Sequence, residues 1–189
     1  MNQLHVLRAC DYPRMAWKNG GGFTEEITRD AGEGLDGFGW RLSIADIEES
    51  GGFSAFAGYQ RIISVLQGDG MRLLVDGQAS RPLLAFDAFA FSGESQVSCN
   101  LLGGPIRDFN LIYAPLRYRA RLQWLDGTSR LYSSASTVLL FAASNHVEVA
   151  MSGETHALGR YDCLRLDGNH DLLGFEVQGR FCLIELIPV

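Results

Sequence analysis

The chain has 189 residues, a formal net charge of −6, and 47% hydrophobic and 20% charged residues. This length suits one domain or two small halves sharing a core, and it permits a stable core without metals or disulfides. The negative charge excludes general affinity for nucleic acid, because phosphate binding needs a basic face. Residues 1–13 lack a signal-peptide core and no apolar run can cross a bilayer, so we expect a cytoplasmic protein with no membrane partner.

The first distinctive stretch is residues 17–27, which read Trp-Lys-Asn-Gly-Gly-Gly-Phe-Thr-Glu-Glu-Ile. Consecutive glycines indicate a turn with positive φ or a close approach to the backbone, and the polar residues beside them suggest an approaching ligand. A loop that only needs flexibility has the same composition. Alternating or fully apolar patterns then predict strands at residues 40–45, 71–75, 97–101, 138–141, 146–151 and 181–184.

Other segments keep a fixed order behind the glycine run. They are Trp40-Arg41-Leu42-Ser43, Gly52-Phe53-Ser54-x-Phe56-x-Gly58-Tyr59-x-Arg61, Val65-Leu66-x-Gly68-x-Gly70 and Asp108-Phe109-Asn110-Leu111-Ile112. Together with residues 17–27 this set resembles the HutD/Ves family of bacterial proteins, from about residue 17 to about residue 112. The resemblance implies a bicupin fold and a link to histidine utilisation. It does not supply a settled biochemical activity.

An internal repeat supports the same fold. The motif Asp87-x-Phe89-x-Phe91-x-Gly93 recurs about 75 residues later as Asp162-x-Leu164-x-Leu166-x-Gly168. We therefore predict an all-β bicupin with little helix, made of two fused cupin-like barrel or sandwich halves. Residues 1–115 form the N-terminal half with the pocket, and residues 116–189 form the C-terminal half, packed with it as one unit. Cupin sheets often pair through an edge or an outer face, so the sequence leaves a homodimer open.

The sequence gives little support for a metal site or for a catalytic nucleophile. Many cupins bind a metal through a His-x-His pair, a Glu and a later His, but here the histidines lie apart, at positions 5, 146, 156 and 170. We therefore predict no metal and no cofactor. There is no Gly-x-Ser-x-Gly elbow. In the pair Glu25-Glu26 only one carboxylate can face a pocket, and Glu26 is favoured because it belongs to the Thr24-x-Glu26 pattern.

Anion recognition has more support, because the matched segments contain several cations. Lys18 supplies a point charge beside the glycine backbone, and Arg41 or Arg61 offers a planar guanidinium for a carboxylate. Asp108 and Asn110 share one strand face and can look into one cavity. The alternative is structural, with Arg41 facing solvent or pairing with Asp108. The predicted ligand-binding residues are Trp17, Lys18, Asn19, Gly20, Gly21, Gly22, Thr24, Glu26, Arg41, Ser43, Arg61, Asp108 and Asn110.

The family resemblance also suggests which ligand the site binds. It implies a small anionic metabolite from histidine breakdown, such as urocanate or formylglutamate, bound by a protein that modulates histidine utilisation. An alternative is a cofactor-independent enzyme that acts on such an intermediate with Glu26 or Asp108 as base. A third is a stress or interaction protein without a ligand, as the Ves side of the family suggests. The residues favour the binding protein over the enzyme.

Overall fold

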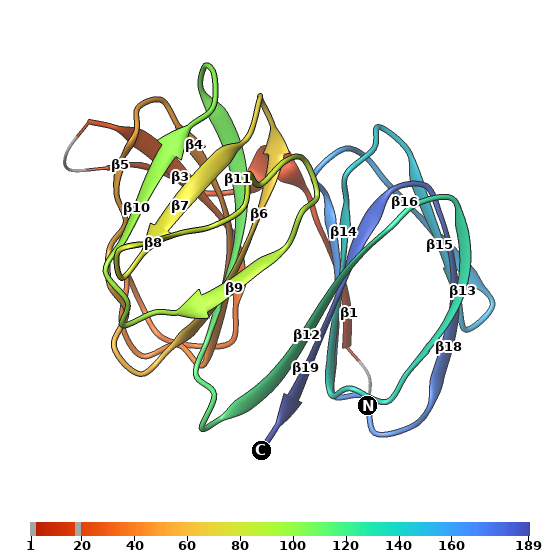
Figure 1. The fold of residues 1–189 in the computed structure, drawn as a ribbon. Coiled ribbons are helices and arrows are strands. Elements are labelled where there is room, and N and C mark those ends of the chain that lie inside the picture. Colours follow the sequence, from red (N-terminus) through yellow and green to blue (C-terminus); the bar gives the residue numbers. More distant parts are fainter. Residues whose placement is uncertain (1–2, 18–19) are drawn as a thin grey trace. The chain divides into compact units, whose positions relative to one another are not determined.

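The computed structural model describes residues 3–17 and 20–189. Contacts divide the chain into unit 1, which holds Met1–Tyr12 and Tyr118–Val189, and unit 2, which holds Pro13–Arg117. Each unit is a cupin-like pair of antiparallel sheets (Figure 1). Within the described residues the sole helical element is the short 3-10 turn η1, so the prediction of an all-β bicupin is confirmed.

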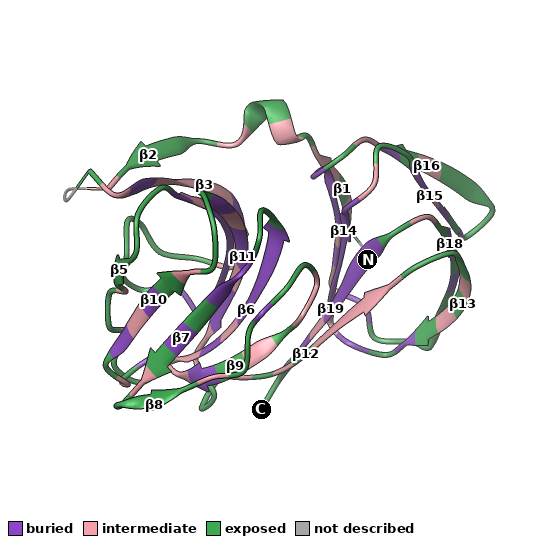
Figure 2. Ribbon diagram, turned by 45° about the horizontal axis from the view of Figure 1, so that its top comes forward, coloured by how far each residue is buried: buried purple, intermediate pink, exposed green. Residues whose placement is uncertain are grey.

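In unit 2 one sheet has the strand order β2-β3-β4-β11-β6-β9 and the other has the order β5-β10-β7-β8. Its strands are β2 (Arg14–Ala16), β3 (Gly22–Arg29), β4 (Trp40–Ile47), β5 (Gly51–Gly52), β6 (Gln60–Gln67), β7 (Met71–Val75), β8 (Gln78–Ala79), β9 (Phe89–Ser92), β10 (Val97–Leu101) and β11 (Ile106–Tyr113). The central strands β4, β6 and β11 are largely buried, whereas β2, β5 and β8 are exposed (Figure 2).

In unit 1 the orders are β1-β17-β14-β19-β12 and β13-β18-β15-β16. Its elements are β1 (Gln3–Leu7), η1 (Ala9–Asp11), β12 (Tyr118–Leu125), β13 (Thr128–Ser133), β14 (Thr137–Ala142), β15 (Val147–Met151), β16 (Glu154–Leu158), β17 (Cys163–Asp167), β18 (Leu173–Gln178) and β19 (Phe181–Pro188). Strand β14 is buried along its whole length, as its unbroken apolar run requires.

The boundaries of the predicted halves need a correction at the N-terminus. Residues 1–12 belong to unit 1 rather than to the N-terminal half, because β1 pairs antiparallel with β17, from Gln3 opposite Asp167 to Leu7 opposite Cys163. The other boundary lies between Arg117 and Tyr118. Local sequence patterns do not predict the pairing of β1 with β17, because these strands are far apart in the sequence.

The repeat extends to the backbone of the turns. Phe86 and Tyr161 have φ values of 65° and 69°, a region that bulky residues rarely adopt. Each is followed by the aspartate of the repeated motif, Asp87 in unit 2 and Asp162 in unit 1. Both carboxylates accept a hydrogen bond from the backbone N–H three residues upstream, at 3.1 and 3.0 Å. The two halves therefore share one strained turn held by one aspartate.

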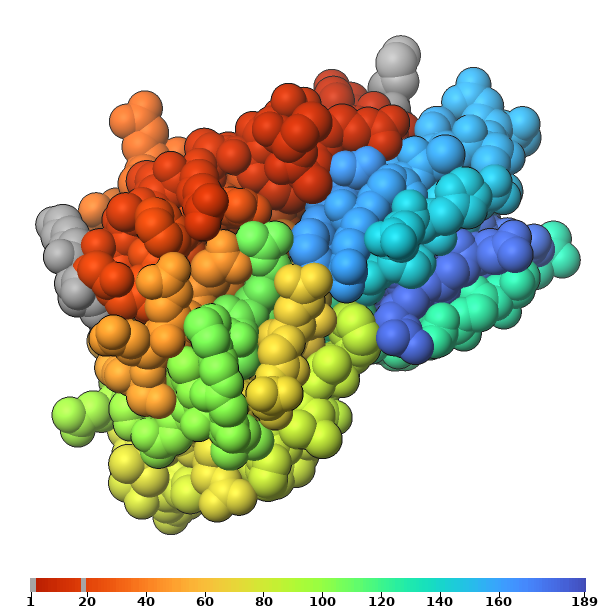
Figure 3. Space-filling model, turned by 90° about the horizontal axis from the view of Figure 1, so that it is seen from above, coloured from red at the N-terminus to blue at the C-terminus, as the bar shows by residue number. Residues whose placement is uncertain are grey.

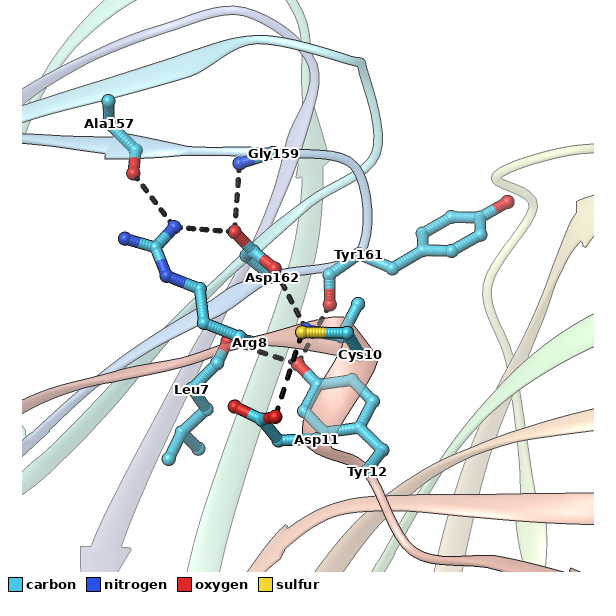
Figure 4. Close-up of polar contacts among 10 residues, drawn as sticks. Leu7, Arg8, Cys10, Asp11, Tyr12, Ala157, Gly159, Tyr161 and Asp162 are labelled. Carbon is cyan, nitrogen blue, oxygen red and sulfur yellow. Dashed lines mark hydrogen bonds and ion pairs between the residues drawn. The ribbon is translucent and has the colours of Figure 1, made fainter.

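In unit 1 this aspartate also holds the N-terminal segment (Figure 4). Asp162 accepts hydrogen bonds from Arg8 Nη1 at 2.6 Å and from the Ala9 N–H at 2.8 Å, besides the bond from Gly159. Burial acts to raise the pKa of Asp162, but these bonds and the charge of Arg8 outweigh it and hold the pKa below its ordinary value. The carboxylate thus joins the end of β1 to the turn before β17.

We expect Asp162→Ala to lower the free energy of unfolding by about 2 kcal/mol, because it leaves two backbone N–H groups without an acceptor. The matched control is Asp87→Ala at the equivalent position. The Asp87 side chain is 38% exposed against 10% for Asp162, so water replaces its bonds and the expected loss is under about 1 kcal/mol. Urea titration measures both variants. Equal losses would show that the attachment of the N-terminal segment adds nothing.

Candidate functional site

The inner face of the larger sheet of unit 2 is apolar at one end and polar at the other. Ile47 of β4 and Ile106 of β11 belong to the hydrophobic core of this unit. Since strand residues alternate between faces, Arg41 and Ser43 share the inner face with Ile47, and Asp108 and Asn110 share it with Ile106. The barrel interior therefore encloses charged groups, which must find partners there.

Arg61 lies on β6 and is 6% exposed. Its Nη1 donates to the Ser54 carbonyl at 3.2 Å, and its Nε donates to Asn110 Oδ1 at 3.4 Å. Within the described part of the chain it has no carboxylate at ion-pair distance. Burial lowers the pKa of Arg61 to about 10; the charge of Asp108 acts to raise it and that of Arg41 to lower it further. Three ring centroids lie 5.3, 5.5 and 5.1 Å from its Cζ, those of Phe53, Phe56 and Phe91.

A second cluster joins Glu26 to two arginines. Arg41 Nε donates to Glu26 Oε2 at 2.7 Å, and Arg29 donates to both oxygens of the same carboxylate. Burial acts to raise the pKa of Glu26, but the hydrogen bonds and charges of the two arginines outweigh it and hold the pKa below its ordinary value. Glu26 is therefore an ionised anchor for Arg41. This corrects the structural alternative, since Arg41 neither faces solvent nor pairs with Asp108.

The participation of Arg29 was missed by the sequence analysis. Residues three apart on a regular strand point to opposite faces, so Glu26 and Arg29 do not look like a pair. The register between β3 and β4 shifts between Glu26 and Thr28, and this irregularity brings both side chains to one face. Nothing in the alternation of residues 22–29 signals the extra residue.

Asp108 is the deepest charged group of the site, at 3% exposure. Its Oδ1 has no hydrogen-bond partner among the residues that the structure describes. Burial raises the pKa of Asp108 to about 7, against the lowering effects of the Arg61 charge and a backbone hydrogen bond at Ala45. A carboxyl in this position can change its charge near neutral pH.

The glycine run forms a turn in which one of the three predicted anion donors already has a backbone partner. The Gly20 N–H donates to the Trp17 carbonyl at 3.1 Å. It is therefore not free to donate to an anion, although the sequence predicted that role for it. Gly22 is required for another reason: a Cβ there would lie 2.2 Å from the Asp46 carbonyl oxygen. Trp17 Nε1 donates to Thr24 Oγ1 at 2.7 Å. The predicted residues Lys18 and Asn19 lie outside the described residues.

A small pocket of about 80 Å³ opens beside this connection. Its lining includes Trp17, Gly21, Ile47 and Phe53. Phe53 also contacts Arg61, so one ring links the pocket to the buried cation. Figure 3 looks onto this unit where the orange, yellow and green turns gather. Ser50 also lines the pocket, and its Oγ accepts a hydrogen bond from the Leu101 N–H at 2.9 Å, which joins the pocket rim to β10.

A larger hollow of about 410 Å³ lies in unit 1. It is formed on the outer face of one sheet, around Tyr132, Gly174 and Glu176, and it contains none of the predicted site residues. Its charged side chains are on a solvent-facing surface, whereas those of unit 2 are buried. Burying a charged side chain costs free energy, so buried charges are retained where they have a compensating role. The interior of unit 2 is therefore the better candidate for the functional site.

Two further observations bear on cofactors and membranes. Across residues 3–17 and 20–189, no three His, Cys, Asp or Glu side chains come together in a way that would hold a metal ion. The donor set thus does not fit the metal site found in many cupins. The described residues also include no helix with the length and apolar character needed to cross a membrane.

The structure brings together most, but not all, of the predicted site. Arg41, Ser43, Arg61, Asp108 and Asn110 face one interior with Glu26 and Thr24. Trp17 and Gly21 line the small pocket of this unit, whereas Gly20 and Gly22 are not part of its lining. Trp40 occupies the opposite face of β4 from Arg41, so it does not line this interior.

A family model described as HutD matches residues 9–183. An uncharacterized 21.2 kDa protein from the hutC 3′ region of Pseudomonas putida is 86% identical over 188 residues, which cover 99% of each chain. Protein Ves of Escherichia fergusonii is 29% identical, covering 92% of this chain and 89% of its own length. These relatives match along nearly the whole chain.

Comparison with solved structures also finds proteins that match nearly the whole chain. HutD from Pseudomonas fluorescens SBW25, in a formate condition, has a TM-score of 0.91 and 64% identity, covering 99% of this chain and all of that one. A conserved protein of unknown function from Pseudomonas aeruginosa PAO1 has a TM-score of 0.95 and 58% identity, covering 98% and 99%. A salicylate 1,2-dioxygenase, with a TM-score of 0.59 and 10% identity over 97% of this chain and 80% of its own, shares the fold alone.

Proposed function

Because this chain belongs to the HutD family, which its name links to histidine utilisation, we propose that it binds a small carboxylate inside unit 2 and so modulates that process. Arg41 and Arg61 hold the carboxylate in this proposal. Urocanate and formylglutamate are the ligands that the family link favours. The function is sensing or buffering of such a metabolite rather than its turnover.

One observation carries this proposal. Arg41 and Arg61 are both buried, and the positive charge of Arg41 lowers the pKa of Arg61 in addition to the larger effect of burial. Among the described residues, the Nη atoms of Arg41 and Nη2 of Arg61 make no hydrogen bond. Two repelling guanidinium groups with unused donors are stabilised by an anion that accepts from both. A carboxylate has the shape and charge for this role.

The dimensions of the pocket favour a slender ligand. A volume of about 80 Å³ accommodates a carboxyl group and a few further atoms. The related P. fluorescens protein was determined in a formate condition, and formate is the smallest carboxylate. The pocket lining contains Glu49 and neither Arg41 nor Arg61, so in this proposal the carboxyl group of a ligand passes Phe53 to reach Arg61, and a longer acid such as urocanate needs Trp17 or Phe53 to move outward.

Thermal unfolding in the presence of carboxylates tests the proposal. At about one hundred times its Kd, a ligand adds about 2.7 kcal/mol of stability, which raises the Tm of a chain this size by about 5–10 °C. The probes are formate, urocanate and formylglutamate, each compared with its neutral amide. We expect a rise with at least one acid and none with the matching amide. Equal effects of acid and amide, or no rise with any acid, would contradict the proposal.

The deep carboxyl of Asp108 supports one alternative, a cofactor-independent enzyme. Its pKa, raised by burial to about 7, suits a general base near neutral pH. Glu26 does not suit that role, since its pKa is lowered and both oxygens accept from arginine. Incubation of urocanate or formylglutamate with pure protein separates the two functions. Consumption of either compound at a rate that Asp108→Asn abolishes would favour the enzyme.

A further inference from the structure

The surroundings of Asp108 make its charge sensitive to what binds Arg61. Asp108 faces Ala45 of β4 on one side and Val65 of β6 on the other, and both neighbours are apolar. Its Oδ1 makes no hydrogen bond to any described residue. The ionised form is therefore favoured mainly by the positive charge of Arg61, with a smaller contribution from the backbone hydrogen bond at Ala45.

Charged and titratable groups approach Asp108 from three neighbouring strands. From β6, Arg61 is the favourable charge, and no ion pair of 4.0 Å or less joins the two side chains in the described chain. From β4, Arg41 lies on the same inner face, while Asp46 acts unfavourably from the outer face. From β10, Cys99 is neutral, because burial raises the pKa of its thiol to about 12. Arg61 is thus the principal support for an ionised Asp108.

We propose that Asp108 takes up one proton when a carboxylate binds to Arg41 and Arg61, so that the site binds an anion together with a proton. This rests on the function proposed above. The bound carboxylate neutralises the guanidinium that supported the Asp108 anion, and it adds a second negative charge inside the barrel. Solvent supplies the proton, and the protonated carboxyl can donate a hydrogen bond from its otherwise unpaired oxygen to the ligand. The net charge of the interior is then unchanged by binding.

The direction of the pH dependence follows from linkage. In the free protein the pKa of Asp108 is about 7, and loss of the Arg61 charge raises it in the complex. Below pH 7 the carboxyl is already protonated, so affinity does not change. Above pH 7 each binding event must capture a proton, and affinity falls by up to about tenfold per pH unit until the pKa of the complex is reached.

Titration calorimetry with formate tests this inference, because formate itself does not titrate between pH 6 and 9. At pH 8 the binding enthalpy is compared in HEPES and Tris, whose ionisation enthalpies differ, and the difference gives the number of protons taken up. We expect a value near one for the wild type. We expect a value near zero for Asp108→Asn, with an affinity that is constant from pH 6 to 9.

Asp46→Asn is the matched control: Asp46 lies on the outer face of the adjacent strand, pairs with Arg107 Nε at 2.7 Å, and acts to raise the pKa of Asp108, so its loss leaves Asp108 ionised in the free protein at pH 8. It is expected to keep the proton uptake of the wild type. Formate binding with no proton uptake by the wild type would overturn the inference and leave the proposed function standing. No binding of any carboxylate at any pH would overturn the proposed function as well. The wild-type measurement decides even if Asp108→Asn does not fold.

Discussion

Arg61→Met is expected to weaken carboxylate binding by at least about 100-fold while leaving the fold as stable as before or more stable. A loss of this size corresponds to about 2.7 kcal/mol, the expected value of charge-assisted bonds to a buried anion. The stability follows from the structure: Arg61 is buried with no ion pair to any described residue, and a methionine packs well among Phe53, Phe56 and Phe91. A residue that costs stability and binds ligand is typical of a functional site.

Isothermal titration with formate and urea titration without ligand measure the two effects separately. Arg72→Met is the matched control, since Arg72 is an exposed arginine on β7 of the same unit. It should change neither quantity. Undiminished binding by Arg61→Met would remove Arg61 from the site. A loss of binding together with a large loss of stability would instead assign Arg61 to the scaffold.

Glu26→Gln is expected to lower the free energy of unfolding by about 3 kcal/mol at pH 7. Glu26 is the acceptor for both Arg29 and Arg41, and its loss removes the hydrogen-bonded carboxylate that these two largely buried cations share. The pKa of Glu26 is lowered in the folded protein, so its contribution is present above the unfolded value and is lost as the pH falls through the folded one. The difference between variant and wild type should therefore shrink in acid.

The adjacent residue supplies the control for this prediction. Glu25 lies on the other face of β3, where its carboxylate is 4.0 Å from Arg14 Nε and 3.9 Å from Arg107 Nη2. Such loose pairs contribute little, so Glu25→Gln should cost under about 1 kcal/mol. Urea titrations at pH 7 and pH 3 measure both variants. Similar losses for the two at pH 7 would contradict the proposed anchoring of Arg41 by Glu26.

Much of the candidate site follows from the period of two along strands. Arg41 and Ser43 alternate with large apolar residues, and Asp108 and Asn110 alternate with Phe109 and Leu111. Strands placed side by side then carry these side chains to one interior, which the register between β4 and β11 provides. The sequence also indicated the close backbone approach at Gly22. These features depend on local geometry, so local patterns predict them.

Other features depend on residues far apart in the chain. The shift near Glu26 that brings Arg29 into the cluster, and the pairing of β1 with β17, arise from contacts that no short segment encodes. The choice of Glu26 rather than Asp108 as the partner of Arg41 is of the same kind.

By itself the sequence therefore determined the all-β class, the repeat, the family and the strand faces that carry polar groups. Only the tertiary structure decided which charged side chains form ion pairs and which of the described ones are buried without an ion pair. Ionic partners and pKa values depend on distance and burial in three dimensions, whereas alternation and turn chemistry depend on neighbouring residues alone.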